Sequence, residues 1–501
     1  MQKELKTNIV INLIRTITMT VLSFVTFPIV CRLLGDSMLG SFSWATSFVY
    51  YFIVLSKISI PNIAIRECAK VKEDPIKLSK KVQEFFILQA IMTVLSFGLM
   101  CLIVFTIPSF QDTINQTLIF ILSLNFLTSV FAFEWVFTAL EKHTYLSIRS
   151  IVILAIVDIL IFAFIKRPDD VYLYTFITTL TTILTVVSNL IILPRYVKFK
   201  TSGPYNLKQY IPMLGIMFFI SLLLAIYNKT DSFILGLIDK SKESVGSYSV
   251  GMKGVDIVIG IFTALSSVFM PRASALVAKN DEGNYRKLNE HSSNLVFFVT
   301  VPAIALMSTL SYPITSLISG SFDGKSYTEA SSVLIALCSL MLTYSLANMI
   351  YTQILIPKNK EKIYLYAMLI GSIVNIGLSL LAGIYIFDNT PAFGIALMTS
   401  ITDVLILIFL VVFTFKDSRR MIFNFNNLKI IIISVIIGVV AYFIGPILLE
   451  ALNNSMDITY AAILEILIIL AGAIMFYFVS LLLLKENIIC STLNIKRKAE
   501  K

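Results

Sequence analysis

The chain has 501 residues, of which 57% are hydrophobic and 14% are charged, and its formal net charge is +10. Soluble domains are typically about 45–50% apolar and about 25% charged, so this composition excludes a soluble globular protein and indicates a polytopic membrane protein. No polar stretch exceeds roughly 25 residues, which is too few to form a catalytic domain with a core of its own.

Apolar runs long enough to cross a bilayer recur along the whole chain. A helix needs about 20 apolar residues to span the hydrocarbon core, and the sequence predicts about fourteen such helices. They cover residues 9–31, 41–62, 84–107, 116–139, 147–165, 171–193, 211–235, 247–270, 293–318, 329–356, 363–387, 391–415, 428–449 and 459–484. The expected fold class is therefore an all-α membrane protein, with both termini on the same side.

The distribution of lysine and arginine indicates which side that is. If the N-terminus is cytoplasmic, the cytoplasmic segments hold 29 of the 40 basic residues and the external loops hold 6. Because basic residues accumulate on the cytoplasmic side of membrane proteins, both termini are predicted to be cytoplasmic. The same rule accounts for the positive net charge, so no nucleic-acid partner is expected.

A short pattern occurs twice, about 200 residues apart. Leu34-Gly35 followed by Gly40-Ser41 recurs as Leu235-Gly236 followed by Gly246-Ser247. Repeats at this distance indicate a duplicated lobe, and lobes of six helices each are related by an axis along the membrane normal. The predicted parts are an N-terminal lobe over 1–200, a C-terminal lobe over 201–420, and two further helices with a basic cytoplasmic tail over 421–501.

Charged residues occur inside several of the apolar runs. Ionisable groups at membrane depth are costly and indicate functional sites by default. The basic ones are Arg15, Lys57, Lys229 and Lys253, and the acidic ones are Asp158, Asp231, Asp256 and Asp403. The alternatives are that the basic side chains extend to the interface, and that the acids form internal ion pairs or helix-to-helix hydrogen bonds.

Other residues give no sign of catalysis or metal binding. The five cysteines and two histidines are scattered without metal-ligand spacing, so no metal site and no cofactor are predicted. Arg149, at the edge of the 147–165 run, is expected to anchor its helix at the interface.

Several stretches resemble the Wzx-like polysaccharide-repeat-unit flippases of the multidrug/oligosaccharidyl-lipid/polysaccharide exporter superfamily. Two of them are PIVCRLLGDSMLGSFSWATSF (28–48) and FEWVFTALEKHTYLSIRS (133–150). The others are residues 59–70, 354–381 and 393–406, and the pattern Asp231, Leu235-Gly236, Gly246-Ser247-Tyr248-Ser249 and Met270-Pro271-Arg272. Each motif is weak alone, and their order and spacing over the first twelve predicted helices carry the resemblance.

The resemblance implies a transporter of the bacterial cytoplasmic membrane and not an enzyme. Its cargo would be an undecaprenyl-diphosphate-linked oligosaccharide, moved from the inner to the outer leaflet by alternating access for a cell-surface polysaccharide such as a capsule or O-antigen. Polymerases and glycosyltransferases of the same pathway are the implied partners, beside membrane lipid. The alternatives are a multidrug exporter of the same superfamily, a peptidoglycan-precursor flippase, or an enzyme acting on the same lipid, which the short external loops disfavour.

Such a cargo suggests roles for the charged and aromatic residues. The candidates for the pyrophosphate are the cations Arg15, Lys57, Lys229 and Lys253. The candidates for sugar contact are Tyr50, Tyr227, Tyr248 and Glu134, although Glu134 suits a structural role equally well. Asp231, Asn375 and Asp403 are the candidates for a coupling Na⁺ or H⁺, because carboxylate and amide oxygens suit hard cations.

Overall fold

The computed structural model describes residues 2–198, 205–210, 222, 225, 227 and 229–486. Within these residues the chain is helical without strands, and 12 helices are long and apolar enough to cross a membrane. The all-α membrane fold predicted from composition is therefore confirmed.

The number of spans stays a prediction. Helix α1 (Gln2–Lys57) covers the first two predicted spans, which meet at Gly35 with φ 74° and ψ 173°. Glycine is the residue that adopts this conformation readily, because it has no Cβ. The predicted span 211–235 lies largely outside the described residues.

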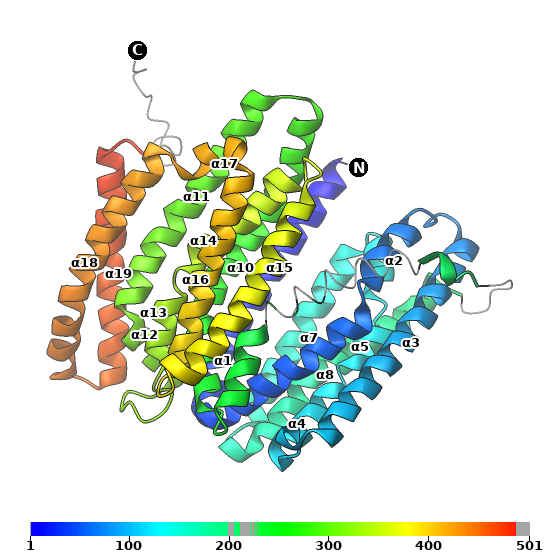
Figure 1. The fold of residues 1–501 in the computed structure, drawn as a ribbon, viewed down its shortest axis with the longest axis horizontal. Helices are drawn as coiled ribbons and strands as arrows, with labels where there is room; N and C mark the ends of the chain where they lie inside the picture. Colours follow the sequence, from blue (N-terminus) through cyan, green and yellow to red (C-terminus); the bar gives the residue numbers. More distant parts are fainter. Residues whose placement is uncertain are drawn as a thin grey trace. The chain divides into compact units, whose positions relative to one another are not determined.

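The chain packs as two compact units, and the first runs from Met1 to Gly246. In it α1 packs against α3, α4 and α7, and α2 packs against α6 and α3 (Figure 1). Its further helices are α2 (Ile60–Ala69), α3 (Pro75–Thr106), α4 (Thr113–Ser123), α5 (Phe126–Phe131), α6 (Glu134–Ala139), α7 (His143–Phe164), α8 (Val171–Ile192) and the short η4 (Lys208–Tyr210).

The second unit runs from Ser247 to Lys501. In it α11 packs against α18, α18 against α19, α15 against α16, and α12 against α19. Its helices are α10 (Glu243–Ala278), which begins in the first unit, α11 (Glu282–Thr309), α12 (Ser311–Ser319), α13 (Ala330–Leu337), α14 (Leu340–Ile350), α15 (Glu361–Leu381), α16 (Pro391–Phe413), α17 (Phe415–Ile422), α18 (Phe425–Asn453) and α19 (Ile458–Leu483). The predicted three-part division at residues 200 and 420 is not tested by this packing and stays a prediction.

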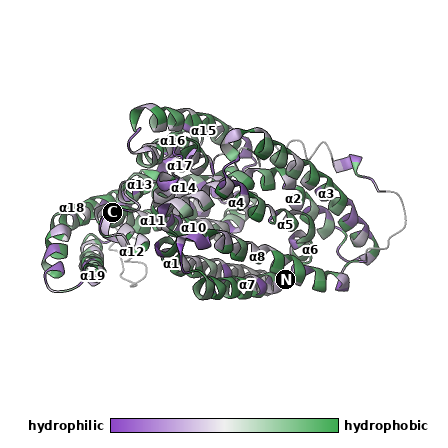
Figure 2. Ribbon diagram, turned by 90° about the horizontal axis from the view of Figure 1, so that it is seen from below, coloured by the Kyte–Doolittle hydropathy of each residue, from purple (hydrophilic) through white to green (hydrophobic). Residues whose placement is uncertain are grey.

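The helix surfaces are apolar where a soluble protein would be polar. Figure 2 shows hydrophobic residues dominating helices such as α3 and α18, with hydrophilic residues at helix ends and in loops. On α18, Phe443 is 65% exposed and Ile447 is 70% exposed. Exposed apolar surface on this scale requires a hydrocarbon solvent, which confirms a multi-pass membrane protein.

Two of the predicted spans are broken near one end. The chain passes from α1 to α2 through Ile58 (φ 38°) and Ser59 (φ 55°), and from α5 to α6 through Phe133 (φ 49°). Pro61 explains part of the first break, since proline suits the first turn of a helix but not its interior. Left-handed residues other than glycine cost about 1–3 kcal/mol each and persist only where the surroundings hold them.

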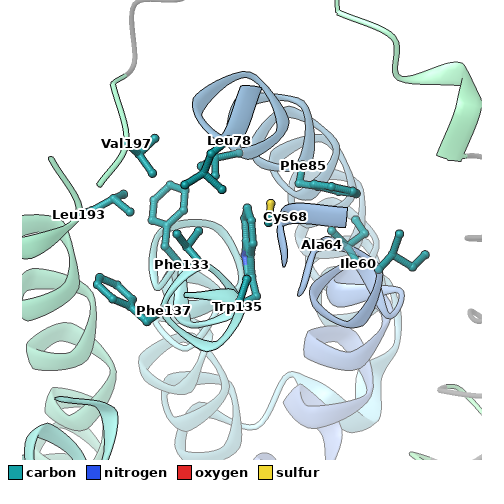
Figure 3. Close-up of a cluster of buried hydrophobic side chains, with 14 of the residues drawn as sticks. Ile60, Ala64, Cys68, Leu78, Phe85, Phe133, Trp135, Phe137, Leu193 and Val197 are labelled. Carbon is teal, nitrogen blue, oxygen red and sulfur yellow. The ribbon is translucent and has the colours of Figure 1, made fainter. Parts of the chain in front are cut away.

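A buried apolar cluster holds both breaks in place. Side chains of α2, α3 and the α5–α6 segment point toward one another around Trp135 (Figure 3). Ile60 follows the first break and is fully buried, and Phe133 at the second break is 2% exposed. The cluster therefore supports α2 and α6 as short, separate helices at one end of this unit.

Candidate functional site

A cavity of about 400 Å³ lies in the first unit, beside the two helix breaks. Its lining includes Lys57 and Tyr50 from α1, Asn62 from α2, Thr128 from α5 and Glu134 from α6. Three of the residues predicted for the site, Lys57, Tyr50 and Glu134, thus line the same cavity. Sequence reasoning did not identify Asn62 or Thr128, because polar residues near a helix end are common and their shared orientation depends on packing.

The helix breaks determine which groups reach this cavity. Both left-handed residues, Ser59 and Phe133, are part of the lining. Irregular backbone at membrane depth is tolerated where it is buried in protein or lines a polar cavity. The breaks therefore position Asn62 and Glu134, at the starts of α2 and α6, around the same space as Lys57.

Glu134 is held by a buried arginine. Arg149 on α7 forms an ion pair with the Glu134 carboxylate, and the Arg149 side chain is 6% exposed. A second guanidinium nitrogen of Arg149 donates to Asn189 Oδ1 at 2.6 Å, and the Tyr145 hydroxyl donates to the same oxygen at 2.8 Å. Asn189 in turn donates to the carbonyl of Ala132.

The expectation that Arg149 is an interface anchor is therefore wrong. Its head group is turned into the protein, because Glu134 and Asn189 offer it acceptors there. Nothing in the local sequence around Arg149 distinguishes these two arrangements, since both acceptors come from other helices.

Lys229 lies close to the aromatic lining of the cavity. Its ammonium nitrogen is 6.0 Å from the centre of the Tyr50 ring. Tyr50 precedes Lys57 by seven residues of helix, or about 10 Å. Lys57 and Lys229, two of the four cations predicted for a pyrophosphate, thus lie along one side of α1. Lys57 is at one end of the segment 50–57, and Lys229 comes from another segment and lies near Tyr50 at the other end.

The neighbouring residues on the Lys229 segment contact α1 as well. Tyr51 is within hydrogen-bonding reach of Thr230, and its ring lies edge-on to Phe233 with 5.5 Å between centres. Asp231, predicted as part of the ion site, follows Thr230 and is 8% exposed. The described residues of this segment therefore pack closely against α1.

The remaining predicted residues lie elsewhere. Arg15 is partly buried on α1, and neither it nor Tyr227 is among the described residues that line the cavity. Lys253 and Tyr248 lie on the part of α10 that belongs to the second unit, where Lys253 is partly buried and Tyr248 is 5% exposed. Of the four predicted cations, Lys57 lines this cavity and Lys229 lies near it, and the shared pyrophosphate site of all four stays a prediction.

Two of the three residues predicted for the ion site lie close together in the second unit. Asp403 on α16 is fully buried and accepts a hydrogen bond from Thr343 Oγ1 at 2.5 Å. Asn375 on α15 donates to Thr399 Oγ1 at 3.0 Å, one helical turn before Asp403. Asp231, the third residue, belongs to the first unit.

Oxygen atoms are available around Asp403. Asn375 Oδ1 and Thr402 Oγ1 are buried, and neither has a hydrogen-bond partner within the described parts of the chain. Carboxylate, amide and hydroxyl oxygens are the ligands that hard cations prefer. The arrangement suits Na⁺ or a proton, and the sequence alone indicated Asp403 and Asn375 by their position in apolar runs.

The two copies of the repeated pattern touch each other. Ser37 Oγ donates to the carbonyl of Ser241 at 2.6 Å. A Cβ atom at Gly40 would lie 1.8 Å from the carbonyl oxygen of Lys242, and one at Gly246 would lie 2.3 Å from that of Asp36. Glycine at both positions therefore permits a contact that any side chain would block, and a polar cavity of about 490 Å³ lies beside it.

Comparison with known proteins identifies the family. Residues 5–277, more than half of the chain, match the model of the polysaccharide biosynthesis protein family (Polysacc_synt), and residues 217–381 match the MatE family. No curated protein sequence matches the chain significantly.

Three solved structures share the fold. An inward closed conformation of the lipid II flippase MurJ aligns over 96% of this chain and 99% of its own, with 18% identity and a TM-score of 0.67. An inward-facing multidrug resistance MATE transporter of the MOP superfamily aligns over 83% and 96%, with 13% identity and a TM-score of 0.56. A eukaryotic MATE transporter aligns over 84% and 98%, with 13% identity and a TM-score of 0.54.

At these identities the solved structures establish the fold, and the family match establishes membership. One of the three is a flippase and the other two are transporters. The chain therefore belongs to the polysaccharide biosynthesis protein family, within the multidrug/oligosaccharidyl-lipid/polysaccharide exporter superfamily of membrane transporters.

Proposed function

We propose that this protein moves undecaprenyl-diphosphate-linked oligosaccharides from the inner to the outer leaflet of the bacterial cytoplasmic membrane, for a cell-surface polysaccharide. The observation that carries the proposal is the cavity that Lys57, Tyr50 and Glu134 share beside two broken helices. A polar cavity within a membrane unit suits a cargo whose sugars and phosphates cannot cross hydrocarbon.

The charge of the cavity favours an anionic cargo. Lys57, Arg149 and Glu134 together carry one net positive charge, because Glu134 forms an ion pair with Arg149 and also lies close enough to interact electrostatically with Lys57. An ammonium group binds phosphate through charge-assisted hydrogen bonds. A cavity of this sign attracts a diphosphate and repels the cationic amphiphiles that a multidrug exporter would carry.

The polar and aromatic lining suits the sugars of the same cargo. Asn62 and Thr128 offer hydrogen bonds to sugar hydroxyls, and Tyr50 offers an aromatic ring and a hydroxyl. Lys229 comes from another segment and lies 6.0 Å from the Tyr50 ring on α1. It is the second cation proposed for the diphosphate. The polyprenyl tail remains in the lipid throughout, so the protein needs no enclosed apolar channel for it.

Transport by alternating access would use the repeated halves. The Gly40–Gly246 contact joins the two copies of the repeated pattern at span ends that the distribution of charges assigns to the outside. Binding of Na⁺ or H⁺ at Asp403 and Asn375 would supply the driving force. If transport by the Asp403→Asn protein still followed the ion gradient normally, this coupling role would be excluded.

A peptidoglycan-precursor flippase is the second candidate. It is favoured by the fold shared with the lipid II flippase, whose structure aligns over nearly the whole chain. Both cargoes carry a polyprenyl diphosphate, so the cavity alone does not distinguish them.

Mass spectrometry of lipid-linked intermediates in depleted cells distinguishes the candidates. Accumulation of an undecaprenyl-diphosphate oligosaccharide on the cytoplasmic side supports the proposal and identifies the glycan. Accumulation of the peptidoglycan precursor supports the second candidate. Sensitivity to cationic drugs without any accumulating lipid contradicts both.

The role of the cavity is tested by Lys57→Ala. Loss of one charge-assisted contact costs about 1.5–3 kcal/mol, so cargo binding should weaken roughly ten- to a hundredfold. Lys57→Arg, which keeps the charge, should retain most of the activity. Lys70→Ala is the matched control, because Lys70 is exposed and pairs with Glu67 at 2.6 Å outside the cavity. Arg15→Ala, compared at equal protein levels, tests the cation that does not line this cavity.

A further inference from the structure

A glutamate lies buried in the last membrane helix, far from the cavity residues in sequence. Glu465 is the eighth residue of α19 (Ile458–Leu483), about 10 Å along the helix axis from its first residue. It is 2% exposed, within a helix of 26 residues that is long and apolar enough to span a membrane. The site described above does not use it.

The surroundings of Glu465 are apolar. Gly445 on α18 faces it, and a Cβ atom built at Gly445 would lie 3.1 Å from Glu465 Oε1, 3.6 Å from Ile469 and 3.9 Å from Leu310. Leu310, Ile469 and Ala441 form a buried apolar cluster between α12, α18 and α19. Glycine at position 445 thus makes room for a carboxyl group inside an otherwise hydrophobic contact.

In the described part of the chain, the carboxyl group has no counter-ion. Its Oε2 atom is buried without a hydrogen-bond partner among the residues that the structure describes. On α18 the ionisable groups are Lys429, which donates to the carbonyl of Leu484 at 2.8 Å, and the exposed Tyr442 and Glu450.

The other helices packed around Glu465 offer no counter-ion either. Tyr312 on α12 donates to the carbonyl of Phe322 at 3.0 Å, Tyr477 on α19 donates to that of Phe298 at 2.7 Å, and Tyr460 is 66% exposed. On α11 the ionisable residues fall within 282–291, about 22 Å along the axis from Leu306 near the cluster.

An ionised carboxylate in such a place is strongly disfavoured. Removing a charge from water without a partner costs far more than the free energy of protonating a carboxylate near neutral pH, so such a group takes up a proton instead. We propose that Glu465 is a membrane-embedded proton-binding site, occupied when α18 and α19 pack as in this structure. The proton leaves only when this contact opens to water, so the packing of the two helices is sensitive to alkaline pH.

Infrared spectroscopy of the full chain in lipid nanodiscs tests the proposal. The difference between the spectra of the wild type and Glu465→Gln, taken at about pH 6, should contain the carbonyl stretch of a protonated carboxylic acid, although free glutamate is almost fully ionised there. Carboxylate bands in that difference spectrum instead would overturn the proposal. Glu450→Gln is the matched control, since Glu450 is exposed near the end of α18, and its difference spectrum should contain carboxylate bands.

A stability measurement gives a second, independent outcome. A neutral acid without hydrogen bonds can be replaced by an uncharged side chain of similar size, so Glu465→Gln and Glu465→Met should both fold. Their thermal midpoints at neutral pH should be at or above that of the wild type, because the wild-type carboxyl group ionises there on unfolding. As the pH rises, the wild type should lose stability relative to both variants. If both variants fail to fold, Glu465 is instead an ionised partner in a structural contact, and the proposal is wrong.

Discussion

The ion pair between Arg149 and Glu134 controls the charge of the candidate cavity. Arg149 is almost fully buried, whereas the Glu134 side chain is 53% exposed and lines the cavity. The arginine therefore acts through the glutamate, which it orients and neutralises. Lys57, like Arg149, lies near the end of a predicted span. Unlike Arg149 it lines the cavity itself, and in the proposed mechanism it binds the cargo.

Breaking this pair should destabilise the protein as well as change the cavity. Glu134→Gln leaves the buried guanidinium without its anion, and hydrogen bonds to charged groups contribute about 1.5–3 kcal/mol. We expect the free energy of unfolding to fall by about that amount. A double-mutant cycle with Arg149→Met, followed by thermal unfolding in detergent, should give a coupling energy of about 1 kcal/mol or more. Strictly additive effects would contradict the pair.

The junction between η4 and α3 depends on a second buried carboxylate. Glu84 is 2% exposed and accepts hydrogen bonds from the Tyr210 hydroxyl at 2.8 Å and from the backbone N–H of Asn206 at 3.0 Å. Lys81 lies 3.7 Å from the same carboxylate. Burial, together with the neighbouring Glu84, raises the pKa of Tyr210, so its hydroxyl stays protonated and donates at neutral pH.

Tyr210→Phe should therefore loosen the segment 205–210 from α3. Loss of a donor to a buried carboxylate costs about 1–3 kcal/mol. Since the pKa of Tyr210 is raised in the folded state, its protonated hydroxyl stabilises the fold fully below the ordinary tyrosine pKa of about 10, and this contribution falls as the pH rises further. The loss of stability in Tyr210→Phe should therefore be complete at neutral pH. Tyr205→Phe is the control, since Tyr205 is 45% exposed and donates to the uncharged Gln83. Equal losses of stability in the two variants would contradict the prediction.

At the scale of elements, broken and closely crossing helices define the functional features. The break at Ser59 separates the short α2 from the long α1, and the break at Phe133 separates the short helices α5 and α6. The buried cluster around Trp135 holds α2 and α6. Gly40 and Gly246 allow the two repeated segments to approach to backbone contact. Both features depend on what packs beside the helix rather than on helix propensity.

Gly40→Val should prevent the contact between the repeats. The new side chain would overlap the carbonyl oxygen of Lys242, a backbone atom that cannot move away at low cost. The Ser37 side chain donates to the backbone carbonyl of Ser241 at 2.6 Å, so cysteines at these two positions should form a disulfide in the wild-type background and do so much more slowly with Gly40→Val. Gly98→Val is the control, because nothing lies within 4 Å of its Cβ position. Equal disulfide formation in both variants would show that the crossing is not needed.

At the scale of the whole molecule, the surface is matched to a bilayer. Exposed apolar side chains cover helices such as α3, α18 and α19, while the basic residues are concentrated in one set of loops. Orientation follows from these loops, since the helices themselves are compatible with either direction. The prediction that both termini are cytoplasmic depends on an even number of spans.

Labelling of single cysteines in intact cells tests this orientation. After replacement of the five native cysteines, Lys325→Cys should react with a membrane-impermeant maleimide, because it lies in a predicted external loop and is 84% exposed. Lys77→Cys, 72% exposed in a predicted cytoplasmic segment, should react only after the cells are permeabilised. The reverse pattern would mean that the orientation is inverted, and labelling of both positions from the same side would mean that a span between them has been missed or added.

The amino-acid sequence by itself determined the class of protein, the approximate extent of most spans and the existence of a repeat. These properties are local, because the bilayer sets the length and polarity of each crossing segment regardless of its neighbours. The charged residues within spans could also be recognised one by one.

Which of those residues act together depends on the tertiary structure. Lys57 and Glu134 share a cavity, Arg149 neutralises Glu134, and Glu465 faces a glycine without a partner among the described residues. Each of these outcomes depends on side chains from helices distant in sequence, brought together by packing. A charge within one helix has the same local pattern whether it meets an ion, a proton or a substrate.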